Sequence, residues 1–285
     1  GYTLEFADCL LFFLPGVPHE MRRMFEESVI PIVCAGRYGL GRRERRIVRL
    51  FGIPESEVDA RLSPIIARFS SVDFHFVADA PEVAIKLTPR GETKGEGEGA
   101  VIAAADAVAE TLAEFVFARN RKPVEQLILE ALQRRGAWLS TAESVTGGRI
   151  GDLLTNVAGS SHLFAGGIVA YTARAKHELL GVPEGVLLET GTVSEETTTA
   201  MAQGVRARLD TDFGLAVTGF AGPEGGGSEK PVGTTFIAVA TSEETTCTHH
   251  RFEGSRERIK EVAARTALHL LRRRIEQTPL PVEEV

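Results

Sequence analysis

The sequence has few cysteines, no long apolar run and no excess of basic residues. Its 285 residues include three cysteines, Cys9, Cys34 and Cys247, which are far apart in the chain. An odd number of scattered cysteines does not form a disulfide framework, so we expect a reducing, cytoplasmic compartment. The uncharged run Cys9–Val17 contains Pro15 and is well short of the ~18 residues that a membrane helix needs. The first eight residues lack the basic stretch of a secretory signal. Neither a membrane nor an export signal is therefore expected.

The overall charge is acidic. The chain has 32 Lys and Arg against 39 Asp and Glu, a formal net charge of −7, so nucleic acid is not an expected partner. A local exception is an arginine cluster made of Arg42, Arg43, Arg45, Arg46 and Arg49. The nearby segment Gly36–Gly39 has the letters of a GxxG loop, but it precedes a predicted strand instead of joining two helices. A non-catalytic, nucleotide- or nucleic-acid-binding regulator is therefore the alternative to an enzyme.

The length predicts more than one domain, because a single core rarely organises 285 residues. In residues 1–42 we expect a buried strand at Phe6–Leu14, followed by a turn and a helix. Residues 43–120 have the pattern of a small α+β domain that ends in a long Ala-rich helix, Ala100–Ala118. Residues 121–285 alternate helical and strand patterns, which is typical of a three-layer α/β/α domain.

Within the third domain, a predicted strand at Trp138–Ala142 leads into a glycine-containing turn, Thr141–Gly148. This turn presents Ser144 and opens a helix at Arg149–Thr155. Its glycines let the backbone approach a ligand, and the free N–H groups of a helix start suit an anion or a developing oxyanion. The alternative is that Ser144 or Thr146 only caps the helix.

A second strand end, at Ile168–Tyr171, precedes a predicted helix that carries Lys176. A serine hydroxyl becomes a good nucleophile only when a base removes its proton, and lysine is one known partner. The lysine must then be neutral, with a pKa lowered from ~10.4 to ~7–8 by burial or nearby positive charge. Arg174 or Lys230 could supply that charge. Without such a partner, Lys176 would be an ordinary solvated helix residue.

The segment Thr218–Thr234 is rich in Gly and Pro and is too long for a tight hairpin. It is either a loop that cradles a phosphate, with Lys230 as its cation, or a flexible surface connection. A metal site is not expected, because the sequence contains no HExxH or CxxC pattern and His249 and His250 alternate across a predicted strand.

Six short motifs of the chain occur together in one known family. They are TAESxTGG (Thr141–Gly148), AGSS (Ala158–Ser161), the Tyr171–Lys176 segment, GxVSEET (Gly191–Thr197), TGxAGP…EKPVGT (Thr218–Thr234) and GxR (Gly254–Arg256). The combination resembles the competence/damage-inducible CinA family over nearly the whole chain. Residues 121–278 are similar to the family's C-terminal domain, which also occurs alone as the nicotinamide mononucleotide (NMN) amidohydrolase PncC. Residues 43–119 resemble its KH-like middle domain.

The resemblance implies a Ser/Lys amidohydrolase that converts NMN to nicotinic acid mononucleotide and ammonia in pyridine nucleotide salvage. Ser144 would be the nucleophile, Lys176 the general base and Tyr171 a hydrogen-bonding neighbour. The geometry of the turn, and not the resemblance, assigns the oxyanion to backbone N–H groups near Val145–Gly147. The expected substrate-binding residues are Thr146, Gly147, Gly148, Gly219, Ala221, Gly222, Lys230 and Arg256. No cofactor or metal is expected in this domain, and a homodimer is the expected assembly.

The opening Leu14–Met21 resembles the end of the family's molybdopterin-binding-like N-terminal domain, so residues 1–42 are expected to be a remnant of it. The metal-dependent ADP-ribose pyrophosphatase activity associated with the intact domain is therefore expected to be absent, along with its divalent metal. Three positions depart from the usual family pattern. Val145 replaces a common Cys, Ala173 replaces an Asn that could orient the substrate or the lysine, and Lys260 replaces an Arg. The change at Ala173 leaves open a domain that binds the nucleotide without turning it over.

Overall fold

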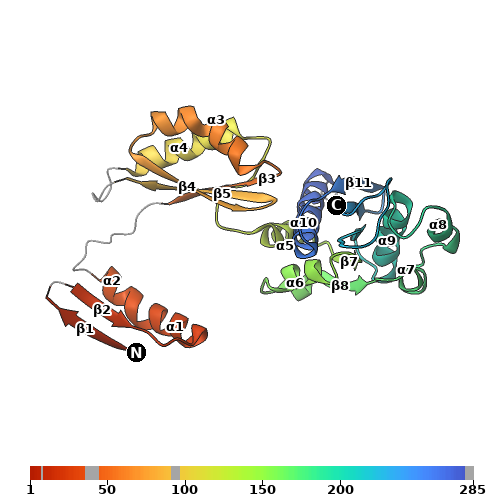
Figure 1. The fold of residues 1–285 in the computed structure, drawn as a ribbon, viewed down its shortest axis with the longest axis horizontal. Helices are drawn as coiled ribbons and strands as arrows, with labels where there is room; N and C mark the ends of the chain where they lie inside the picture. The colour runs from red at the N-terminus through yellow and green to blue at the C-terminus, as the bar shows by residue number, and fades with distance from the viewer. Residues whose placement is uncertain (8, 36–44, 91–96, 280–285) are drawn as a thin grey trace, which may run out of the picture. The chain divides into compact units, whose positions relative to one another are not determined.

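The computed structural model describes residues 1–7, 9–35, 45–90 and 97–279. It divides the chain into two compact units (Figure 1). The first unit comprises Gly1–Leu50, Glu55–Val77 and Val83–Asn120. The second comprises Phe51–Pro54, Ala78–Glu82 and Arg121–Val285. Among the described residues, no helix has the length and apolar character needed to cross a membrane.

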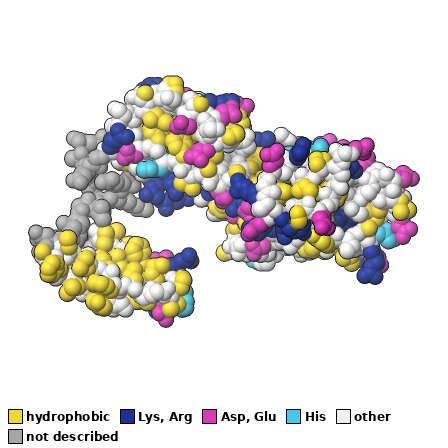
Figure 2. All heavy atoms as spheres, in the orientation of Figure 1, with side chains coloured by type: hydrophobic (Ala, Val, Ile, Leu, Met, Phe, Trp, Pro, Cys, Tyr) yellow, Lys and Arg dark blue, Asp and Glu magenta, His cyan; other side chains and the backbone are white. Residues whose placement is uncertain are grey.

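The N-terminal segment is a two-stranded hairpin followed by short helices. Strand β1 (Tyr2–Phe6) pairs antiparallel with β2 (Cys9–Phe13), and α1 (Pro18–Met24), η1 (Phe25–Val29) and α2 (Ile30–Cys34) follow. The expected buried strand at Phe6–Leu14 is wrong. Strand β2 is shorter and only half-buried at best, because two strands alone leave one sheet face uncovered. That face carries exposed apolar side chains, seen in yellow in Figure 2: Tyr2, Leu4, Phe6, Leu11 and Phe13.

The rest of the first unit contains a four-stranded sheet of order β4-β5-β3-β6. Its elements are β3 (Arg46–Phe51), α3 (Glu55–Arg68), β4 (Val72–Asp79), β5 (Glu82–Pro89), α4 (Glu98–Thr111) and β6 (Val116–Ala118). Figure 1 shows α3 and α4 together on one face of this sheet.

The expected single helix over Ala100–Ala118 is wrong at its end. Helix α4 ends at Thr111, and β6 pairs antiparallel with β3, with Arg49 opposite Ala118 and Leu50 opposite Val116. The β-branched and aromatic residues Phe115–Phe117 favour a strand over a helix when a partner strand is available. That partner is distant in sequence, so helical periodicity alone did not reveal it.

The second unit has the expected three-layer architecture around a five-stranded sheet of order β11-β10-β9-β7-β8. Strand β7 runs parallel to both neighbours, whereas β10 is antiparallel to β9 and β11. The strands are β7 (Leu139–Glu143), β8 (Phe164–Val169), β9 (Phe213–Gly219), β10 (Thr234–Ala240) and β11 (Thr245–Arg251). The helical elements are α5 (Val124–Arg135), α6 (Arg149–Thr155), η2 (Ser160–His162), α7 (Ala173–Leu180), α8 (Glu184–Glu189), α9 (Glu195–Arg208) and α10 (Arg256–Gln277).

Helix α9 covers one face of this sheet, packing across β7, β9, β10 and β11, with α7 and α8 beside it. Helices α5, α6 and α10 form the opposite layer (Figure 1). Close packing of α9 depends on small residues, because a Cβ on Gly214 would lie 2.3 Å from the carbonyl oxygen of Ala202. Strand β7 is buried along its whole length between β8 and β9. The turn that follows β7 is therefore held at the carboxyl end of a central strand, where ligand sites of α/β sheets commonly form.

Candidate active site

Ser144 is the first residue after β7, and backbone contacts fix the turn that carries it. Its N–H donates to Val217 O at 2.9 Å, and the N–H of Gly147 donates to Ser144 O at 3.1 Å. Gly147 and Gly148 have φ values of 64° and 96°, a left-handed backbone that strongly favours glycine. The chain can therefore reverse within four residues and enter α6. The side chain of Ser144 is buried, with only 6% of the residue exposed.

Lys176 reaches this serine from α7. Thr172 caps the helix by accepting the N–H of Ala175 at 3.1 Å, which sets the rotation of the first turn. The Lys176 Nζ then donates to Ser144 Oγ at 2.8 Å and to Ala170 O at 3.0 Å. Only 1% of Lys176 is exposed. Burial lowers its pKa from 10.5 to about 8, and neither Arg174 nor Lys230 contributes to that change.

The two side chains are also tied together through the backbone. The N–H of Ala170 donates to Glu143 O at 2.9 Å, while Ala170 O accepts from Lys176 Nζ. Glu143 directly precedes Ser144, so the strand that delivers the hydroxyl and the segment that anchors the amine share one hydrogen bond. The arrangement is a buried hydroxyl beside a buried amine that can lose its proton near neutral pH.

The helix start that follows Ser144 is already occupied. The carboxylate of Glu143 accepts the N–H groups of Gly148 at 3.0 Å, Ile150 at 3.1 Å and Gly151 at 2.9 Å. The expectation of an anion site at this helix start is therefore wrong, because an acidic side chain of the protein fills it. Within the described part of the chain, the N–H groups of Val145 and Thr146 have no hydrogen-bond acceptor. These two groups remain open to a developing oxyanion.

Three of the expected site residues meet at a second point. Arg256, the first residue of α10, donates from Nη2 to Tyr171 Oη at 2.7 Å and from Nη1 to Gly222 O at 2.6 Å. Tyr171 follows β8 and is 57% exposed. The contact joins the Tyr171–Lys176 segment, the Thr218–Thr234 segment and the start of α10. Three sequence motifs thus converge at Arg256.

The remaining expected residues have varied surroundings. The Thr146 hydroxyl is buried and has no hydrogen-bond partner among the described residues. Lys230 donates from Nζ to Thr190 O at 3.1 Å and to Val193 O at 2.9 Å, so it holds a neighbouring segment of its own domain. Gly219 lies at the end of β9, where a Cβ would come within 2.6 Å of Thr234 O, and Ala221 is buried nearby. Tight packing explains the glycine at position 219 without a ligand.

Comparisons with known proteins agree with this architecture. A family model described as "CinA C-terminal domain" matches residues 121–275, and one described as "Damage-inducible protein CinA KH domain" matches residues 45–118. The chain belongs to the CinA family. A CinA-like protein of Geobacter sulfurreducens is 39% identical over 275 residues, which are 96% of this chain and 67% of that protein. One of Geobacter metallireducens is 41% identical over 276 residues, with the same coverage.

Solved structures of competence/damage-inducible and CinA superfamily proteins match just over half of this chain. A competence/damage-inducible protein of Agrobacterium tumefaciens is 37% identical with a TM-score of 0.51, over 56% of this chain and 100% of that one. A CinA superfamily protein of Klebsiella pneumoniae is 30% identical with a TM-score of 0.53, over 55% of this chain and 100% of that one. The CinA resemblance found from sequence motifs is therefore confirmed.

Two residues near Ser144 had no role assigned from the sequence, where Lys260 was noted only as the replacement of an Arg. Glu143 belongs to the TAES motif of this CinA protein, but its side chain was not assigned a role. Lys260 lies one turn after Arg256 on α10, and a Cβ on Gly147 would be 3.4 Å from its Nζ. Its ammonium therefore covers the Ser144 turn. The i, i+4 spacing of Arg256 and Lys260 on one predicted helix was the signal that could have placed the two cations side by side.

The described residues of this CinA protein contain no group of three or more His, Cys, Asp or Glu side chains placed to hold a metal ion. Arg42, Arg43 and Gly36–Gly39 lie outside the described residues. In the described part of the arginine cluster, Arg49 packs over the Phe117 ring at 5.5 Å from its centroid. This contact does not test the alternative function, nucleic-acid binding through this region.

Proposed function

We propose that the C-terminal domain is a Ser/Lys amidohydrolase that deamidates NMN to nicotinic acid mononucleotide. The observation that carries the proposal is the 2.8 Å contact between Ser144 Oγ and the buried Nζ of Lys176, whose pKa is lowered to about 8. A hydroxyl and an amine in this relation form the minimal nucleophile and base of an acyl-transfer site. The choice of NMN comes from the family resemblance.

In the first half-reaction, neutral Lys176 accepts the hydroxyl proton as Ser144 Oγ attacks the carboxamide carbon. The oxyanion of the tetrahedral intermediate is held by the N–H groups of Val145 and Thr146, which belong to the same turn as Ser144. Lys176 then donates its proton to the leaving nitrogen, and ammonia departs as the C–N bond breaks. The product of this half-reaction is an ester between Ser144 and the nicotinoyl group.

In the second half-reaction, Lys176 is neutral again and accepts a proton from water, which attacks the ester carbon. The ester C–O bond breaks, the proton returns to Ser144 Oγ, and the free carboxylic acid leaves and releases its remaining proton to solvent. One water is consumed and one ammonia is released for each turnover. The contact between Lys176 Nζ and Ala170 O keeps the amine in place through both half-reactions.

The phosphate of NMN requires cations, because Glu143 already occupies the start of α6. Arg256 and Lys260 are the candidates. Both project from the first turns of α10, and neither has an ion pair with an acidic side chain among the described residues. Arg256 is oriented by Tyr171, and Lys260 lies over Gly147. The unpaired Thr146 hydroxyl is a further candidate for a substrate hydrogen bond.

The test is an assay of ammonia and nicotinic acid mononucleotide formation from NMN with the purified chain. We expect turnover by the parental protein and a loss of at least ~10³-fold in kcat for Ser144→Ala and for Lys176→Met. Ser242→Ala, which changes an exposed serine in the β10–β11 turn, is the matched control and should retain the parental rate. Parental rates in both site variants would disprove the Ser/Lys assignment. A parental protein that releases no ammonia from NMN would disprove the substrate assignment.

A further inference from the structure

We infer that Glu143 is a positioning residue for the nucleophile: its buried carboxylate holds the Ser144 turn in the geometry that Lys176 requires. The inference rests on the proposed role of Ser144 as the nucleophile. Glu143 has no part in the proton transfers described above, yet it is 1% exposed and immediately precedes the reacting residue. A carboxylate is costly to bury unless its oxygens are hydrogen-bonded.

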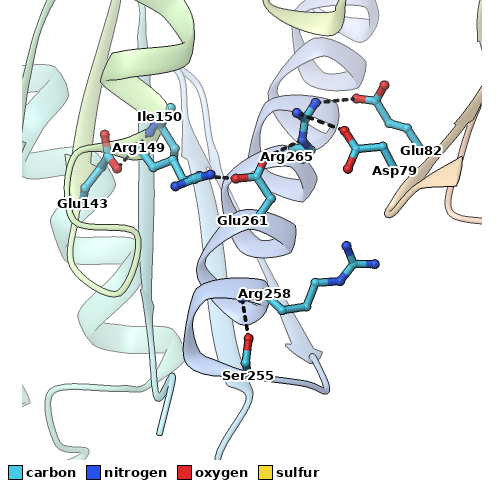
Figure 3. A network of polar contacts seen from close by, with 9 residues as sticks. All are labelled: Asp79, Glu82, Glu143, Arg149, Ile150, Ser255, Arg258, Glu261 and Arg265. Atoms are coloured by element: carbon cyan, nitrogen blue, oxygen red, sulfur yellow. Dashed lines mark hydrogen bonds and ion pairs between the residues drawn. The ribbon is translucent and has the colours of Figure 1, made fainter.

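The Glu143 side chain joins the end of β7 to the start of α6 by hydrogen bonds across the Ser144 turn. Glu143 Oε2 accepts from the N–H groups of Gly148 and Ile150, and Oε1 accepts from the N–H of Gly151. The contact with Ile150 is drawn in Figure 3. Its carbonyl oxygen accepts from Ala170, and its backbone lies in β7 between two parallel neighbours. One residue thus connects the end of the strand to the start of the helix, with Ser144 in the loop between them.

The loop itself supplies little rigidity. Gly147 and Gly148 have positive φ values and no side chains that restrict them, so other conformations of the turn are accessible to the isolated segment. The three N–H bonds to Glu143 select one of these conformations. A negative charge at this place is also favoured by the positive end of the helix.

A second contact anchors the same helix start from outside. Arg149, between Gly148 and Ile150, forms an ion pair with Glu261 of α10, and Glu261 also accepts from Arg265 (Figure 3). The α6 start is therefore fixed both to the strand that precedes Ser144 and to the helix that carries Arg256 and Lys260. Glu143 is the part of this arrangement that acts directly on the Ser144 turn.

Glu143→Gln tests the inference with little change in shape. The amide has one acceptor oxygen and turns an NH₂ donor toward the N–H groups that the carboxylate accepted. The turn should then relax and move Ser144 Oγ away from Lys176 Nζ. Because a displacement of ~1 Å can cost ~10²-fold in rate, we expect kcat for NMN to fall about 10- to 100-fold. KM should change little, because Glu143 contacts no part of the substrate.

Labelling by a fluorophosphonate provides a readout that does not depend on NMN. Ser144 Oγ attacks phosphorus, fluoride leaves and Lys176 takes the hydroxyl proton, so the rate, followed by intact mass, reports the activated serine directly. We expect Glu143→Gln to be labelled about 10- to 100-fold more slowly than the parental protein. Ser194→Ala is the matched control, because Ser194 is also buried and caps a helix start, that of α9, by accepting from Thr197.

The outcomes separate positioning from stability. If Glu143 only stabilised the fold, Glu143→Gln would lower the unfolding midpoint and leave the labelling rate of the folded protein unchanged, which would overturn the inference. Ser194→Ala should show that behaviour. Glu143→Asp has a shorter side chain that cannot span all three N–H groups, so it should also be labelled slowly. A parental labelling rate in Glu143→Asp would also overturn the inference. A parental Ser144 that is not labelled would remove the premise, whereas labelling without NMN turnover would disprove only the substrate.

Discussion

The buried amine of Lys176 predicts an unusual pH dependence of stability. Its pKa in the folded protein is about 8, whereas the ordinary value of 10.5 applies in the unfolded chain. Between about pH 8 and 10.5 the unfolded chain therefore binds one more proton at this site than the folded protein does. Stability from this group rises with pH across that window, because the folded state no longer has to bury an ammonium.

The magnitude follows from the two pKa values. A difference of about 2.5, at about 1.4 kcal/mol for each pKa unit, corresponds to about 3 kcal/mol. Below about pH 8 the folded protein carries this full cost, and above about 10.5 it carries none. Lys176→Met removes the titrating group. It also breaks the hydrogen bonds to Ala170 and Ser144, but that loss adds an offset that does not depend on pH.

The assay is denaturant unfolding of the full chain and of Lys176→Met at intervals from about pH 7 to pH 10.5, over the window that the two pKa values define. Trp138 is the only tryptophan and directly precedes β7, so its fluorescence reports unfolding of the domain that contains Lys176. We expect the unfolding free energy of the parental protein to rise by about 3 kcal/mol relative to the variant across this range. Groups that titrate in both proteins cancel in the comparison.

A constant difference between the two proteins at every pH would refute the reasoning. It would mean that Lys176 has the same pKa in the folded and unfolded states and is not the neutral base that the proposed mechanism needs. A difference that changes in the opposite direction would mean that the folded protein stabilises the ammonium. Loss of activity in Lys176→Met, measured alone, would not distinguish these cases.

Three further predictions concern the site. A pH–rate profile should show kcat/KM for NMN rising about tenfold per pH unit below pH 8 and levelling above it. The reason is that only neutral Lys176 accepts the hydroxyl proton. Tyr171→Phe removes the hydrogen bond that orients Arg256. Steady-state kinetics should show kcat/KM lowered about tenfold, the equivalent of about 1.4 kcal/mol, and the unfolding midpoint should be unchanged. Lys230→Met should destabilise the protein by about 1–3 kcal/mol in denaturant unfolding, because two carbonyl oxygens lose their donor, and an unchanged midpoint would contradict this.

Local chemistry in the sequence determined much of the candidate site. The glycines after Ser144 predicted the sharp turn, because glycine readily adopts positive φ values. In the structure Gly147 and Gly148 have φ values of 64° and 96°. Ser194 caps the start of α9 and Gly181 ends α7 in a left-handed conformation, and both residue types are ordinary sequence signals of helix ends. The alternation of helix and strand over residues 121–285 predicted the three layers.

Other features were decided only by the tertiary structure, because they depend on distances between segments that are far apart in the chain. The strand pairing of β6 with β3 overrode the helical pattern of residues 112–118. The pKa of Lys176 is lowered by burial alone and owes nothing to Arg174 or Lys230. The start of α6, which looked free for an anion, is filled by Glu143. A sequence shows which groups can donate and accept hydrogen bonds. The packing of strands and helices determines which acceptor lies next to a given N–H.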